Sequence, residues 1–97
     1  MMSQDFEWDK AKAAKNLTKH GVPFEYATRV FDDARRVERE DRRRNYGEDR
    51  RVVVGTIEGR LFVIVYTRRG DVTRLISARK ANAREQENHR SALQARP

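Results

Sequence analysis

The chain has 97 residues, of which 37% are hydrophobic and 38% charged, and it carries a formal net charge of +7 and no cysteine. This length predicts one domain, residues 1–97, with a small core under a densely charged surface, and the lack of cysteine excludes disulfides and thiol chemistry. No apolar run approaches the roughly 20 residues of a membrane span, and the N-terminus has no apolar signal-peptide region, so we expect a cytoplasmic protein without a membrane partner.

The positive charge is concentrated in the last two thirds of the sequence. Residues 1–34 carry five cations against six anions, whereas residues 35–51 carry eight against five and residues 52–97 carry nine against four. Nearly all of these later cations are arginines, whose planar guanidinium matches the geometry of phosphate. A nucleic-acid backbone or an acidic protein is therefore the expected class of partner.

The chain begins with a short extended segment and a helix. Phe6–Trp8 is long enough only for an edge strand or an extended lead-in. Asp9 suits the N-cap of a helix that Gly21 ends in the left-handed conformation. Its main apolar contacts should be Ala14 and Leu17, a narrow stripe, so docking must supply most of its stability.

A second helix is expected to follow directly. Pro23 suits its first turn, where the missing N–H would have no partner in any case. The apolar residues with helical spacing that should face the core are Phe24, Ala27, Val30 and Phe31. The pair Asp32-Asp33 lacks the histidine or spaced carboxylates of a metal site, so we interpret it as a helix end and loop and predict no metal or other cofactor.

The next section is rich in arginine and poor in apolar residues. Val37 is its only aliphatic residue before the following strand, and a short strand is possible around Arg36–Glu40. Residues 41–49 indicate an exposed loop with mixed charge. Within that loop, Arg42 and Arg43 lie close to a tyrosine and could also bind single-stranded RNA.

Three strands follow in quick succession. Arg51–Ile57, Leu61–Arg68 and Val72–Ala78 are β-rich runs joined by short glycine-containing connections, which predicts an antiparallel meander. Leu61–Tyr66 is apolar on both faces and should be the central strand.

A polar helix should end the chain. Asn82 and Glu85 have the spacing of a capping box at its start, and residues 83–95 contain almost no apolar side chain besides Ala92 and Leu93. The sequence thus predicts an α+β fold: a lead-in strand, two N-terminal helices, an antiparallel sheet of about four strands and a C-terminal helix, with the helices gathered on one side of the sheet.

The segment Ile76–Ala81 followed by Glu85 resembles the C-terminal signature of BrnT-type toxins, the ribonuclease members of bacterial type II toxin–antitoxin systems. The matching residues in the rest of the chain are Phe6-Glu7-Trp8-Asp9, Asn16, Lys19-His20-Gly21-Val22, Phe24, Ala27, Phe31-Asp32, Arg50, Gly55 and Gly59. Pro23 stands where the family usually has a small capping hydroxyl and Asn82 where it has Thr or Ser, but both replacements preserve a helix start.

The resemblance implies a compact RelE-like ribonuclease fold and an endoribonuclease that acts on RNA. It also implies a cognate BrnA-like antitoxin that neutralises the toxin in a heteromeric complex and carries the domain that binds operator DNA. Two other classes stay open: a nucleic-acid-binding module without turnover, and a structural subunit whose basic face seats an acidic partner.

Cleavage of RNA without a metal needs a proton acceptor, a proton donor and cations for the phosphate. Arg79, at the strand-to-helix junction, is the first choice for the phosphate, and Arg50, Arg68 and Arg74 could complete a cation cluster. Arg74 and Arg79 are five positions apart, so they can share a site only if the strand ends or twists between them.

His20 is the natural general acid or base, although a histidine at a helix end can also simply interact with the last carbonyls. Lys19 and Lys80 are expected to bind RNA. Trp8 and Tyr66 could stack on bases, although large aromatic residues more often pack in the interior. Glu85 is interpreted as a helix-capping partner rather than a catalytic group, and His89, in the last helix, as a solvated side chain.

Overall fold

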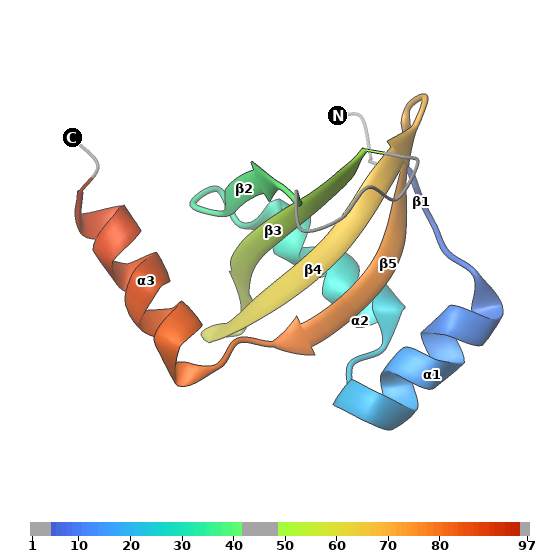
Figure 1. The fold of residues 1–97 in the computed structure, drawn as a ribbon, viewed down its shortest axis with the longest axis horizontal. Helices are drawn as coiled ribbons and strands as arrows, with labels where there is room; N and C mark the ends of the chain where they lie inside the picture. The colour runs from blue at the N-terminus through green and yellow to red at the C-terminus, as the bar shows by residue number, and fades with distance from the viewer. Residues whose placement is uncertain (1–4, 42–48, 96–97) are drawn as a thin grey trace.

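A computed structural model describes residues 5–41 and 49–95 of the chain. Figure 1 shows the arrangement of the elements, which in chain order are β1 (Asp5–Glu7), α1 (Lys10–His20), α2 (Phe24–Ala27), the 3-10 helix η1 (Thr28–Asp32), β2 (Val37–Glu40), β3 (Arg50–Ile57), β4 (Arg60–Arg69), β5 (Val72–Lys80) and α3 (Ala83–Gln94). The α+β class is confirmed, and so is the order of the elements. The second helix is shorter than expected, because one α-helical turn continues as η1.

Within the described residues, the sheet has five strands in the order β1-β5-β4-β3-β2. The strands β2 to β5 form the expected antiparallel meander, and β4 lies at its centre. The lead-in strand differs from the expectation, because β1 pairs with β5 in the parallel direction and makes the sheet mixed. Since β1 and β5 lie near opposite ends of the sequence, no local turn signal could reveal this pairing.

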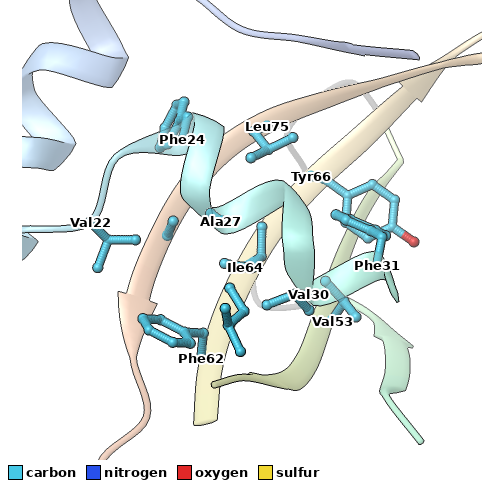
Figure 2. Close-up of a cluster of buried hydrophobic side chains, with 12 residues drawn as sticks. Val22, Phe24, Ala27, Val30, Phe31, Val53, Phe62, Ile64, Tyr66 and Leu75 are labelled. Carbon is cyan, nitrogen blue, oxygen red and sulfur yellow. The ribbon is translucent and has the colours of Figure 1, made fainter. Parts of the chain in front are cut away.

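One face of the sheet, here called the helix face, packs against α1, α2 and η1. Its core is made by buried residues from both layers: Val22, Phe24, Ala27, Val30, Phe31, Val53, Ile57, Phe62, Ile64, Tyr66, Leu75 and Ala78. Figure 2 shows α2 and η1 lying across the strands with these side chains between them. The apolar residues predicted to face the core from the second helix are all buried there.

The opposite face, here called the α3 face, carries a second, smaller apolar cluster of Val52, Val63 and Ala81, with Leu61, Val54 and Val65 packed against it. The helix α3 lies on this side, apart from α1 and α2 (Figure 1). The expectation that all helices gather on one side is therefore wrong. After the capping box at its start, which is confirmed, α3 projects with no residue buried in the described chain.

The first helix docks through a polar residue. Asp9 and Gly21 cap α1 as predicted, but Ala14 is exposed and Leu17 is 48% exposed, so the predicted apolar contacts are wrong. Instead, Asn16 is buried, and its Nδ2 donates to the carbonyls of Val22 (3.1 Å) and Ala78 (2.8 Å), while its Oδ1 accepts from the Ala78 N–H (3.0 Å). The amide of Asn16 thus pairs with the edge of β5 beyond the point where β1 ends.

A close contact between η1 and β3 requires glycine. A Cβ added at Gly55 would lie 3.0 Å from Val30 Cγ1 and 3.2 Å from both Arg36 Cβ and Asp33 Oδ2. Asp33 lies in this contact because its carboxylate accepts hydrogen bonds from the Thr56 N–H and hydroxyl and from the Arg35 N–H.

No helix in the described ranges is long and apolar enough to cross a membrane.

Candidate functional site

The predicted cluster of arginines is divided between two ends of the sheet. Arg50 and Arg74 face Thr67 from either side, and Arg68 faces Thr73, so these three lie where β3 begins and β5 begins. Arg79 lies near the end of β5, about 16 Å from Arg74 at the usual rise of a strand. Arg74 also forms an ion pair with Glu7 of β1.

An irregularity in the sheet puts Arg74 and Arg79 on the same face. Tyr66 pairs with Leu75 but Val65 pairs with Ser77, which leaves Ile76 as an extra residue in β5. This β-bulge reverses the alternation between the two arginines, so both point away from the buried helix face. β5 continues without a break from Arg74 to Arg79. Although the two side chains point to the same face, they remain too far apart to share a site.

Arg79 is held by a carboxylate from the start of α3. Its Nη1 and Nη2 donate to Oε1 and Oε2 of Glu85 at 2.7 and 2.6 Å, a two-point ion pair. The Glu85 carboxylate also accepts from the Asn82 N–H at 2.9 Å. The hydrogen bonds from Arg79 lower the pKa of Glu85. Burial opposes this shift but is the smaller effect, and the Asn82 N–H and the charge of Arg39 lower the pKa further. Glu85 is therefore ionised at neutral pH.

Beside this pair lies a groove between α3 and the α3 face of the sheet, with a volume of about 180 Å³. The residues that line this α3 groove are Val37, Arg39, Val54 and Val63 from the sheet and Glu85, Asn88, His89 and Ala92 from α3. Glu85 and His89 lie on the same face of the helix, one turn apart, which places their Cβ atoms about 6 Å from each other. An apolar floor is thus bordered by an arginine, a carboxylate and an imidazole.

His20 lies at the end of α1, near enough to Arg79 for that charge to act on its imidazole. Burial lowers the pKa of its imidazole, and the charges of Lys19 and Arg79 lower it further. His20 is therefore largely neutral at pH 7 and is able to accept a proton. The predicted neighbours Lys19 and Lys80 are both exposed at this end of the sheet.

Of the two aromatic residues considered for base stacking, Tyr66 is packed in the interior, whereas Trp8 packs against the core and remains partly exposed. Trp8 is half-buried and meets Phe24 edge to face, with ring centroids 5.9 Å apart. Tyr66 is 1% exposed and its hydroxyl donates to Glu38. Burial, together with Glu38, raises the pKa of Tyr66. Tyr66 cannot stack on RNA, because both faces of its ring lie inside the core; this correction follows from its place on the helix face.

Two predicted RNA contacts, Arg42 and Arg43, lie outside the described residues. Glu85 and His89 were not selected by sequence reasoning, although their spacing on one helix was a usable signal. Glu85 was assigned to the capping box, and that bond is present, but the same carboxylate also meets Arg79. No group of three or more histidine or acidic side chains in residues 5–41 and 49–95 is arranged to hold a metal ion.

Comparison with known protein families finds one match that covers most of the chain. Residues 8–85 match a family model described as the ribonuclease toxin BrnT of type II toxin–antitoxin systems. The match ends at Glu85 and includes both partners of the Arg79–Glu85 pair, whereas His89 lies beyond it. No curated protein matches the chain.

Proposed function

The chain belongs to the BrnT family of ribonuclease toxins, and we propose that it is an endoribonuclease that cleaves RNA in the α3 groove without a metal ion. The observation that carries this proposal is the two-point pair between Arg79 and Glu85 at the border of a groove that His89 also lines. These residue types are the cation, base and acid that metal-free transfer of a phosphoryl group requires.

In this mechanism the arginines bind the scissile phosphate. Arg79 offers a planar fork of donors, and Arg39 lies across the groove. As negative charge grows on the phosphate oxygens, Arg79 shifts from the Glu85 carboxylate to the phosphate. The shift stabilises the transition state, and it also removes the contact that lowers the pKa of Glu85.

Glu85, freed in this way, accepts the proton of the ribose 2′-hydroxyl. The 2′-oxygen then forms a bond to phosphorus while the bond from phosphorus to the 5′-oxygen breaks. His89, in its protonated form, donates a proton to the leaving 5′-oxygen. The products are a 2′,3′-cyclic phosphate and a free 5′-hydroxyl, so atoms and charges balance without a further reactant.

His20, which the sequence favoured, is the alternative acid or base. Its support is the lowered pKa that it owes in part to Arg79. It lies on the α1 side of β5 rather than in the α3 groove, so the two histidines make different predictions when each is replaced. The remaining predicted catalytic arginines at the far end of the sheet are proposed to attract and hold RNA rather than to act on the scissile phosphate.

The test is cleavage of a single-stranded RNA by the pure protein in EDTA. Arg79→Ala should reduce the rate by roughly a hundredfold, as loss of one preorganised donor does elsewhere. Arg69→Ala is the matched control, because Arg69 is an exposed arginine at the opposite end of the sheet; it should cleave like the parent.

Three results would contradict the proposal in different ways. Cleavage that disappears in EDTA and returns with a divalent cation would refute metal independence. Equal rates for Arg79→Ala and the parent would remove the α3 groove as the reaction site. RNA binding without any turnover would favour the alternative of a binding module.

Membership of a type II toxin–antitoxin family implies a protein antitoxin as partner. We propose that this partner is a BrnA-like protein that carries the operator-binding domain, and that its acidic residues bind the basic end of the sheet around Arg79. Co-expression should yield a complex that does not cleave RNA until the partner is removed. A partner that binds while cleavage continues would place its contact elsewhere.

A further inference from the structure

Three cavities among the described residues adjoin one another around the end of the sheet where β4 begins and β5 ends. The α3 groove shares His89 with a cavity of about 580 Å³ between α3 and the turn that joins β3 to β4. That cavity shares Arg60 and Lys80 with a third one, of about 440 Å³, on the helix face. The three cavities therefore follow one another around this end of the sheet, with Arg60 and Lys80 at the boundary between the second and the third.

The third cavity, here called the Tyr26 pocket, is mainly apolar. It is lined by Gly21, Val22, Pro23, Tyr26 and Phe62, with Arg60 and Lys80 also bordering it. The ring of Tyr26 is only partly buried and meets Phe62 edge to face, with centroids 5.8 Å apart. The guanidinium of Arg29 lies 5.3 Å from the centre of the Tyr26 ring. The pocket thus presents an aromatic ring that its neighbours hold in a fixed orientation.

The two cations that border the pocket differ from several arginines of this protein. Many others are neutralised by a carboxylate, in the pairs Arg29–Glu58, Arg36–Glu38, Arg74–Glu7, Arg79–Glu85 and Arg90–Glu87. Arg60 and Lys80 are exposed, and no described residue forms an ion pair with either. Their positive charge is therefore available to an anionic ligand at the entrance of an apolar pocket.

We propose that the Tyr26 pocket binds one nucleobase of the single-stranded RNA substrate, while Arg60 and Lys80 bind the adjacent phosphate and direct the strand to the α3 groove. This inference rests on the proposed function, because it assigns a subsite for the same substrate. An aromatic ring beside a cationic track is the arrangement by which proteins hold single strands, since every base has a face that can stack. The succession of adjoining cavities favours RNA over an acidic peptide, because a bound strand must also reach the scissile position.

The first experiment measures the affinity of a fluorescent single-stranded oligonucleotide with 2′-O-methyl riboses, which cannot be cleaved. Arg60→Gln and Arg69→Gln form a matched pair, since they remove the same charge from the first and last residues of β4. Arg60→Gln should weaken binding about tenfold at fixed salt, and Arg69→Gln by less than about threefold. Equal dissociation constants for the two variants would overturn the proposal.

The second experiment places 2-aminopurine in the oligonucleotide, because stacking on an aromatic ring quenches its fluorescence. Tyr26→Leu keeps an apolar side chain against Phe62 but removes the ring, so quenching should be lost and affinity should fall about tenfold. Tyr26→Phe should restore both. Quenching in Tyr26→Leu equal to that of the parent would overturn the base site, and is the result expected if an acidic peptide is the natural occupant.

The two proposals fail separately in these assays. If the parent cleaves RNA in EDTA but the Arg60 and Tyr26 variants bind like the parent, only the subsite is wrong. If the parent neither binds nor cleaves RNA, both the proposed function and the proposed subsite are wrong.

Discussion

The two faces of the sheet differ in what covers them and in what they carry. On the helix face, side chains such as Ile64 and Ala78 are fully buried beneath α1, α2 and η1. On the α3 face, a few valines form the floor of a groove whose borders are arginine, glutamate and histidine. The helix on that side buries none of its own residues within the described chain.

This difference agrees with a division in which the helix face supplies stability and the α3 face carries the proposed chemistry. The helix face supplies most of the apolar burial, which is the main source of folding free energy. The α3 face keeps charged groups near apolar surface and near solvent, which is where substrates can reach them. Substitutions on the two faces should therefore have different consequences, and the following predictions test that division.

The largest effect is expected at the centre of the helix face. Ile64 is 0% exposed in the central strand, so Ile64→Ala should reduce the free energy of unfolding by about 2–5 kcal/mol, because it leaves a cavity. Its neighbour Val63 points to the smaller cluster of the α3 face, and Val63→Ala should cost about 1 kcal/mol. Denaturant unfolding of both variants measures the difference; equal losses would show that the two faces contribute equally.

The next largest effect is expected on the cleavage rate, with almost no effect on stability. His89→Ala should lower the cleavage rate roughly a hundredfold and leave the melting temperature within a few degrees of the parent, because the proposed general acid His89 lies on a projecting helix. His20→Ala, by contrast, should cleave at a rate close to that of the parent. If instead His20→Ala is the slower of the two variants, the acid–base group lies at the end of α1.

A smaller effect is expected where α1 meets the sheet. Asn16→Ala leaves the buried N–H and carbonyl of Ala78 without their partner, so it should destabilise the fold by about 1–3 kcal/mol. Leu17→Ala is the control. Although leucine is more apolar than asparagine, Leu17 is exposed, so its replacement should reduce the free energy of unfolding by well under about 1 kcal/mol. Thermal melts of the two variants would contradict the assignment if Leu17→Ala were the more damaging.

The smallest effect is the pH dependence of the Arg79–Glu85 pair. Because the folded state lowers the pKa of Glu85, the pair stabilises the fold above the unfolded value of about 4.3. That stability is lost as the pH falls through the lower, folded pKa. Since both side chains are partly exposed, the contribution should be below about 1 kcal/mol. The melting temperature of Glu85→Gln should lie slightly below that of the parent at pH 7 and converge with it below about pH 4; a constant difference would contradict the linkage.

The elements of this protein could be predicted from the sequence because their signals are local. Asp9 and Gly21 bound α1, and Asn82 with Glu85 begins α3, through hydrogen bonds between residues only a few positions apart. The apolar run in β4 identified the central strand for a similar reason, since burial on both faces leaves no polar alternation. The family resemblance also rested on short motifs that can be read directly.

The tertiary structure decided which of these elements meet and which way their side chains point. The parallel pairing of β1 with β5 and the burial of Asn16 against Ala78 join residues that are far apart in the sequence. The extra residue Ile76 in β5 reverses the alternation, so counting positions gave the wrong face for Arg79 relative to Arg74. The groove that Glu85 and His89 line exists only because α3 turns to one particular side of the sheet. The sequence of α3 does not predict that side, because a polar helix has no apolar stripe that marks the face to be buried.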